Sequence, residues 1–254
     1  MQKRRLGQTD IEVSVLGLGT VKFGRNEGVK YPQHFTLPRD DEIKNLLSAS
    51  LEVGINLLDT APAYGSSEAR LGKLLKTNRS KWVICTKVGE RFEKGRSEFD
   101  FTEAGMIKSV EESLKKLQTD YLDILLIHSS GDDIKIIEED RVFDTLMKLK
   151  ALGKIRAYGF SSKTIVGGLR ALSVGDVVMV THNLASQAEQ EVIDEARRTQ
   201  KGIFIKKAFN SGHLDAKTSL QFALQTQGVT SVIIGTINPL HLKENAQVAL
   251  AIES

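Results

Sequence analysis

The chain has 254 residues, 41% of them hydrophobic, and is long enough to bury a large core; this length fits one domain if the fold is an α/β barrel, although length alone also allows two. Lys and Arg number 35 against 32 acidic residues, and this net charge of +3 is too mild to favour nucleic acid or an anionic membrane as a partner. The single cysteine, Cys85, excludes an internal disulfide. No apolar run approaches the roughly 20 residues of a membrane helix, and no apolar stretch follows the basic start, so we expect a cytoplasmic protein.

The first 40 residues predict a hairpin, a strand and a long loop. Residues 1–14 alternate as an N-terminal β-hairpin, which can plug one end of a barrel. The apolar run Val15 to Thr20 contains Gly-Leu-Gly, but Lys22 stands where a dinucleotide-binding Rossmann turn needs its third glycine, so that turn is excluded. Residues 20–40 lack periodicity, and loops of this length are often functional.

Strand and helix patterns then alternate regularly to the end of the chain. Strands are predicted at Ile55–Asp59, Trp82–Val88, Tyr121–His128, Ile155–Ser161, Val177–His182, Ile203–Lys207 and Ser231–Gly235. Helices are predicted at Glu42–Val53, from Ser66 or Ser67, from Thr102, at Glu139–Leu152, and near 163–173, 187–200, 216–226 and 239–250, the last capped by Asn238. Counted from Val15, eight units predict a single (β/α)8 TIM barrel domain over residues 1–254 rather than an open doubly wound sheet.

Polar side chains follow three successive predicted strands: Asp59 and Tyr64, then Lys87, then His128. The carboxyl ends of barrel strands meet on one face, where active sites gather. Each group also has a structural explanation. Lys87 and Asp59 can form a buried ion pair, His128 can be a hydrogen-bonded scaffold residue, and Tyr64 can simply pack its ring. Because four such groups follow three neighbouring strands, we favour a catalytic role over a purely structural one.

The segments around these residues resemble the aldo-keto reductases, a family of (β/α)8 barrels with an Asp, Tyr, Lys, His tetrad. The resemblance lies in DTAPAYG at 59–65, the lysine of CTKVG and the histidine of DILLIHSS. GLGT near the start, GFSS at 159–162 and VIIGTINPLHLKEN near the end also match family motifs in the same order. It implies that Tyr64 is the general acid in reduction of an aldehyde or ketone, with Lys87 lowering its pKa from about 10. Asp59 would keep Lys87 charged, and His128 would orient the carbonyl.

The resemblance also implies NADP(H) or NAD(H) as cofactor. The implied cofactor-binding residues are Gly19, Thr20, Ser161, Ser162, Lys206, Gly235, Thr236, Asn238, Glu244 and Asn245. Three positions depart from the family: Ser162 replaces an asparagine, Met179 a glutamine, and Lys206 the aromatic that stacks on nicotinamide. NADPH-preferring members often add a Lys and an Arg where this chain has Gly235 and His241, but Lys243 can compensate, which favours NADPH.

The remaining expectations concern substrate, partners and rival functions. Short segments after His128 and from Lys207 to Lys217 predict an open, shallow site for a small-molecule carbonyl whose identity the sequence leaves open. The five histidines lack metal-ligand spacing, so we expect no metal, and we expect a monomer. Two alternatives stay open: a non-catalytic, nucleotide-binding regulatory barrel, and a lyase or aldolase that forms a Schiff base on Lys87.

Overall fold

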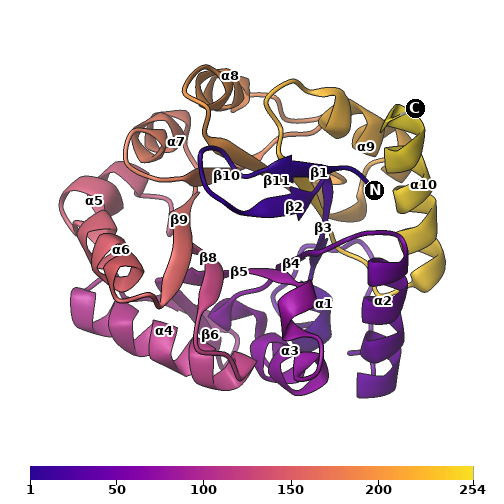
Figure 1. Ribbon diagram of the computed structural model, residues 1–254, viewed down its shortest axis with the longest axis horizontal. Helices are drawn as coiled ribbons and strands as arrows, with labels where there is room; N and C mark the ends of the chain where they lie inside the picture. Colours follow the sequence, from indigo (N-terminus) through magenta and orange to yellow (C-terminus); the bar gives the residue numbers. More distant parts are fainter. Residues whose placement is uncertain (254) are drawn as a thin grey trace.

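The computed structural model, which describes residues 1–253, is a closed barrel of eight parallel strands inside a ring of helices (Figure 1). Each barrel strand pairs with the next along the chain, and the last pairs with the first. This confirms the predicted (β/α)8 barrel. The strands are β3 (Leu16–Gly19), β4 (Leu57–Asp59), β5 (Val83–Val88), β8 (Leu122–His128), β9 (Ile155–Ser161), β10 (Val177–Thr181), β11 (Gly202–Lys206) and β12 (Ser231–Ile234).

The helices pack their apolar faces on the outward side chains of the strands, and this forms the larger of two core clusters. Asn238 caps the last helix as predicted, because its Oδ1 accepts a hydrogen bond of 2.9 Å from Leu240 N. No helix within residues 1–253 is both long and apolar enough to cross a membrane. The ring comprises α2 (Asp40–Glu52), α3 (Ser67–Leu75), α4 (Glu103–Leu117), α6 (Val142–Ala151), α7 (Ile165–Leu172), α8 (Gln190–Arg198), α9 (Ala216–Gln225) and α10 (Pro239–Glu253).

Several short elements lie outside the predicted pattern. A hairpin of β6 (Glu90–Glu93) and β7 (Arg96–Phe99) follows β5, and every residue of β7 is exposed, so no apolar alternation marks it. Helix α5 (Asp133–Glu138) precedes α6, which therefore begins three residues later than the predicted Glu139. The others are α1 (Val21–Gly24) and the single turns η1 (Pro62–Tyr64), η2 (Arg79–Lys81) and η3 (Asn210–Gly212).

The N-terminal hairpin closes one end of the barrel. Strands β1 (Lys3–Arg5) and β2 (Glu12–Ser14) lie across that opening in Figure 1. Leu6, Ile11 and Val13 pack in the second core cluster with the inward side chains of the barrel strands. Because side chains alternate along a strand, the residues two positions beyond Leu57, Cys85 and Leu126 also face inward, at the open end. Those residues are Asp59, Lys87 and His128.

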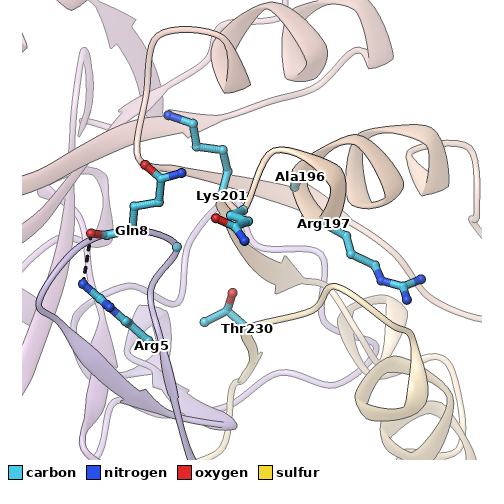
Figure 2. A pocket seen from close by; sticks show the side chains of 8 residues that line it. Arg5, Gln8, Ala196, Arg197, Lys201 and Thr230 are labelled. Atoms are coloured by element: carbon cyan, nitrogen blue, oxygen red, sulfur yellow. Dashed lines mark hydrogen bonds between the residues drawn. The ribbon is translucent and has the colours of Figure 1, made fainter.

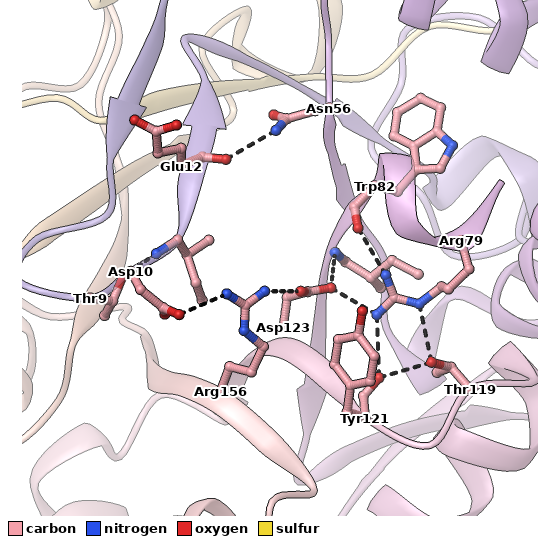
Figure 3. A network of polar contacts seen from close by, with 12 residues as sticks. Thr9, Asp10, Glu12, Asn56, Arg79, Trp82, Thr119, Tyr121, Asp123 and Arg156 are labelled. Atoms are coloured by element: carbon pink, nitrogen blue, oxygen red, sulfur yellow. Dashed lines mark hydrogen bonds and ion pairs between the residues drawn. The ribbon is translucent and has the colours of Figure 1, made fainter.

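A polar network fastens the hairpin to the closed end (Figure 3). Asp123 is only 2% exposed and accepts hydrogen bonds of 2.7 Å from both Arg79 and Arg156 and of 3.0 Å from Ile84 N. Arg156 also reaches Asp10 of the hairpin at 3.2 Å. The network lies at the end opposite Lys87 and His128, so we assign it to stability rather than to chemistry.

Candidate active site

Asp59 and Lys87 form a buried ion pair at the open end of the barrel. Lys87 Nζ donates to Asp59 Oδ1 at 2.6 Å and to the Thr60 carbonyl at 2.9 Å. Burial acts to lower the pKa of Lys87, but the charge of Asp59 opposes it, and the net shift is upward. Lys87 is therefore an ammonium across the neutral range. The neighbouring Cys85 is fully buried with its pKa raised by burial, as expected of a core thiol.

Tyr64 reaches the site from a tight turn after β4. In this turn the backbones of Gly65 and Gly24 lie against each other. A Cβ on Gly65, whose φ is +61°, would lie only 2.2 Å from the Gly24 carbonyl oxygen, so the turn requires glycine at position 65. The Tyr64 ring centroid is 4.7 Å from Lys87 Nζ and 6.3 Å from the centroid of the His128 ring, which meets it edge-on. The four predicted groups thus lie together at one end of the barrel.

The structure corrects the predicted acidity of Tyr64. The resemblance implied that Lys87 lowers the pKa of this phenol. Burial is the largest influence and raises the pKa, Lys87 opposes it, Asp59 adds to the rise, and the net shift is upward. Lys87 thus acts in the predicted direction, but burial outweighs it, and the extent of burial is invisible in the sequence. Tyr64 is therefore a neutral O–H donor across the neutral range.

His128 has a carboxylate partner that sequence reasoning missed. Its Nδ1 lies 2.8 Å from Oε2 of Glu90, the first residue of β6, and Glu90 Oε1 accepts from Ser97 Oγ at 2.5 Å. The ring N–H is not directed at the Glu90 oxygen. The two groups are therefore close enough for an ion pair but do not form a linear hydrogen bond. The sequence feature that could have identified Glu90 is its position, two residues after the predicted strand Trp82–Val88.

A second lysine faces the same opening from β11. Lys206 follows the inward-facing Phe204 by two residues and donates to Ser161 Oγ at 2.9 Å and to the Ser162 carbonyl at 2.6 Å. Burial lowers the pKa of Lys206 to about 7, although the carboxylate of Glu189 opposes this shift. At neutral pH, this amine is therefore poised between its two charge states.

The implied cofactor residues divide into exposed and buried groups. Gly235 and Glu244 are exposed, Asn238 is half-buried, and Thr236 and Asn245 are buried near α10. Gly19 and Thr20 are buried behind the site, and the Thr20 hydroxyl donates to the Asp59 carbonyl at 2.9 Å, so here it braces Asp59. Ser162 is also fully buried, with its hydroxyl donating to Glu189 Oε1 at 2.8 Å.

The long loop after α1 crosses the open end. A Cβ on Gly235 would lie 3.5 Å from the Tyr31 hydroxyl, and one on Gly212 would lie 3.4 Å from Pro32. Burial first, then the charge of Asp59, raises the pKa of Tyr31. The loop thus lies against the segments that follow β11 and β12.

A sequence model of the Aldo/keto reductase family matches residues 15–218, most of the chain. The chain belongs to this family. A Pseudomonas aeruginosa protein described as an aldo-keto reductase superposes with a TM-score of 0.92 at 48% identity, over 99% of this chain and 95% of that one. The holo form of a Bacillus halodurans aldo-keto reductase gives a TM-score of 0.85 at 26% identity, over 98% and 91%.

Curated relatives of this aldo/keto reductase are oxidoreductases. L-galactose dehydrogenase of Arabidopsis thaliana is 27% identical over 100% of this chain and 90% of its own length. D-threo-aldose 1-dehydrogenase of a Pseudomonas species is 28% identical over 94% and 90%. An uncharacterized oxidoreductase of Bacillus subtilis is 32% identical over 64% of this chain, but that match spans only 49% of the relative. The protein is therefore an oxidoreductase of a family that uses nicotinamide cofactors.

A surface cavity of about 540 Å³ lies at the closed end of this aldo/keto reductase (Figure 2). Residues of the N-terminal hairpin, including Arg5 and Gln8, line it together with Arg197 and Lys201. Arg5 turns back onto the Gln8 and Thr9 carbonyls, and Lys201 Nζ donates to the Gly175 carbonyl, so two of its cations are already engaged. The cavity carries none of the four predicted groups, and we do not assign it to catalysis.

Proposed function

We propose that this aldo/keto reductase reduces an aldehyde or ketone to an alcohol with hydride from NADPH, and that Tyr64 is the general acid. The observation that carries the proposal is the buried Lys87 ammonium, held by Asp59 at 2.6 Å and 4.7 Å from the centre of the Tyr64 ring. A structural ion pair alone gives no reason for a phenol and an imidazole to meet it at the mouth of the barrel.

The chemistry follows from the charge that develops on oxygen. A nicotinamide cofactor, when bound, would supply the hydride, and negative charge would develop on the carbonyl oxygen. Tyr64 stays protonated because its pKa is raised by burial, and it gives its proton to the alkoxide, a much stronger base. The Lys87 ammonium then stabilises the phenolate, and Asp59 keeps that ammonium in place. His128 donates a hydrogen bond that orients the carbonyl.

Residues from β9, β11 and α10 fit a nicotinamide dinucleotide. Ser161 and Lys206 place a hydroxyl and an amine at the mouth of the barrel, where they can hold the nicotinamide end. The amino terminus of α10, preceded by Gly235 and Asn238, favours a phosphate because its amides and dipole are positive. Glu244 and Asn245 would contact adenine, and Lys243 nearby favours NADPH over NADH.

The names of two relatives suggest where to search for the substrate. D-threo-aldose 1-dehydrogenase and L-galactose dehydrogenase are named for sugars, so aldoses and their lactone products belong in a substrate panel with simple aldehydes, ketones and quinones. We expect an open, shallow substrate site in a monomeric, cytoplasmic enzyme. Hydride transfer is reversible, so both directions need testing.

The alternative is a barrel that binds nucleotide without turning it over. Met179 and Lys206 favour it, because neither supplies the amide or the stacking ring that the family uses around nicotinamide. NADPH that binds but is never oxidised by any carbonyl in the panel would support this alternative. A Schiff base on Lys87 is disfavoured, because Asp59 keeps that amine protonated and unable to attack a carbonyl.

Tyr64→Phe tests the proposal. We expect a fall in kcat of about 10² to 10⁴-fold, the usual contribution of a positioned acid, with nearly unchanged NADPH affinity in a fluorescence titration. Tyr158→Phe is the matched control, because Tyr158 packs against the outer core away from the site. Undiminished turnover in Tyr64→Phe would refute the assignment of the acid.

A further inference from the structure

Glu90 places a carboxylate at the active site, where the proposed reaction has no role for an unpaired negative charge. Carbonyl reduction builds negative charge on oxygen, and an unpaired anion at the site opposes that charge. The Glu90 side chain is only 12% exposed and lies against His128, which is 20% exposed. A charge in this position needs a partner, and the nearest cationic candidate is the imidazole ring.

The hairpin that carries Glu90 is anchored on three sides. Gly89, with φ at +101°, turns the chain beneath Phe101, whose ring leaves no room for a Cβ. Arg91 pairs with Glu112 of α4 at 3.0 Å. The Arg25 guanidinium lies 3.3 Å from the Phe92 ring centre and donates to the Ala63 carbonyl, one residue before Tyr64. The carboxylate is thus held in register with the turn that carries the acid.

Glu90 is the negative group among the charges that act on His128. Lys87 from β5 and Lys206 from β11 oppose a positive imidazole, and Tyr64 meets the ring edge-on. Burial is the largest influence and lowers the pKa of His128, Glu90 opposes it, and the net shift is downward. For Glu90, burial acts upward, but His128, Ser97 and Lys163 lower its pKa to about 2. The charge of Glu90 also acts on Arg25. Glu90 is therefore ionised at every working pH.

An ionised carboxylate beside Nδ1 restricts the protonation states of His128. Nδ1 must carry the hydrogen, because a deprotonated nitrogen and a carboxylate oxygen repel each other at 2.8 Å, even though the N–H is not aimed along the line between them. In the neutral ring, Nε2 then has only a lone pair, which repels a carbonyl oxygen. Only the imidazolium offers an N–H at both nitrogens. Among residues 1–253, no protein group makes a hydrogen bond with Nε2, so this nitrogen is left for a substrate.

We propose that Glu90 is a positioning residue that acts through His128, stabilising its imidazolium form so that Nε2–H points to the carbonyl oxygen. The assignment rests on the proposed carbonyl reduction. It makes the positively charged ring the form of His128 that supports reduction. Glu90, which lies on a hairpin outside the barrel strands, would then set the pH below which the His128 imidazolium is populated.

NMR titration of the histidine rings tests the coupling without any turnover. The chain has five histidines, and His128→Gln identifies the His128 signal. We expect Glu90→Gln to move the titration midpoint of His128 to lower pH by about 1 to 3 units, the usual effect of losing a close opposite charge. Glu93→Gln, an exposed position on the same hairpin, should leave it in place. Equal midpoints in wild type and Glu90→Gln overturn the proposal.

The pH profile of reduction tests the consequence. We expect kcat/KM to fall as pH rises through the His128 midpoint, and that limb should move to lower pH in Glu90→Gln by the amount seen in the NMR titration. Glu90→Asp, which keeps the charge, should restore much of the wild-type profile, whereas a merely structural role predicts equal damage from both variants. A uniform loss of rate with an unmoved limb overturns the proposal. If wild type reduces no carbonyl, the proposed function fails, and the NMR titration alone decides whether Glu90 sets the charge of His128.

Discussion

Lys87 Nζ lies 2.6 Å from Asp59 Oδ1, with only 1% and 6% of the two side chains exposed. A buried charge without its partner is costly, so removing either one should destabilise the barrel as well as the chemistry. We expect Lys87→Met and Asp59→Asn each to lower the free energy of unfolding by about 3–5 kcal/mol. The double variant should lose less than the sum. Denaturant titrations of the four proteins measure this coupling, and strictly additive losses would contradict it.

The network at the closed end should affect stability and leave catalysis intact. Asp123 is 2% exposed between Arg79 and Arg156, so Asp123→Asn should cost about 3 kcal/mol in unfolding free energy. Asp10→Asn removes an 82% exposed partner of the same Arg156 and should cost less than about 1 kcal/mol. Neither folded variant should change kcat. An equal loss of stability in both variants would show that burial does not govern this network.

The Tyr64 turn should tolerate no side chain at Gly65. Gly65→Ala and Gly95→Ala both place alanine at positive φ, which costs about 1–2 kcal/mol. Only at Gly65 does the new Cβ also meet backbone, 2.2 Å from the Gly24 carbonyl oxygen, whereas nothing lies within 4 Å at Gly95. We therefore expect Gly65→Ala to lose more stability and most of its carbonyl reductase activity. Measurements of unfolding and of kcat on the pair check this, and equal behaviour would be the contrary result.

Lys206 should make the binding of oxidised cofactor depend on pH. The pKa of Lys206 is about 7, so the amine gains positive charge as the pH falls through 7. A positive charge beside Ser161 would repel the positively charged ring of NADP⁺ but not the neutral ring of NADPH. We expect the ratio of NADP⁺ to NADPH dissociation constants to rise between pH 8 and pH 6. Lys206→Met should flatten this change, and Lys217→Met, at an exposed position of α9, should not. An unchanged ratio in wild type would place the nicotinamide elsewhere.

The sequence was sufficient to predict the strands that carry chemistry and was insufficient for the polar elements around them. Leu57 and Leu126 belong to apolar runs that end in Asp59 and His128, and alternation alone turns those polar ends inward. The hairpin with Glu90 buries little apolar surface and leaves no periodic signal. The upward pKa shift of Tyr64 depends on how deeply the ring is enclosed, which only the packed structure shows.

Transfer of deuterium from NADPH labelled at the nicotinamide C4 is the decisive test of carbonyl reduction by this enzyme. The labelled cofactor is mixed with the enzyme and with each carbonyl of the panel, and the masses of the products are measured by mass spectrometry. We expect an alcohol that carries one deuterium on the former carbonyl carbon, formed by wild type and Tyr158→Phe and nearly absent with Tyr64→Phe. Bound NADPH that transfers no deuterium to any carbonyl would contradict the proposed activity.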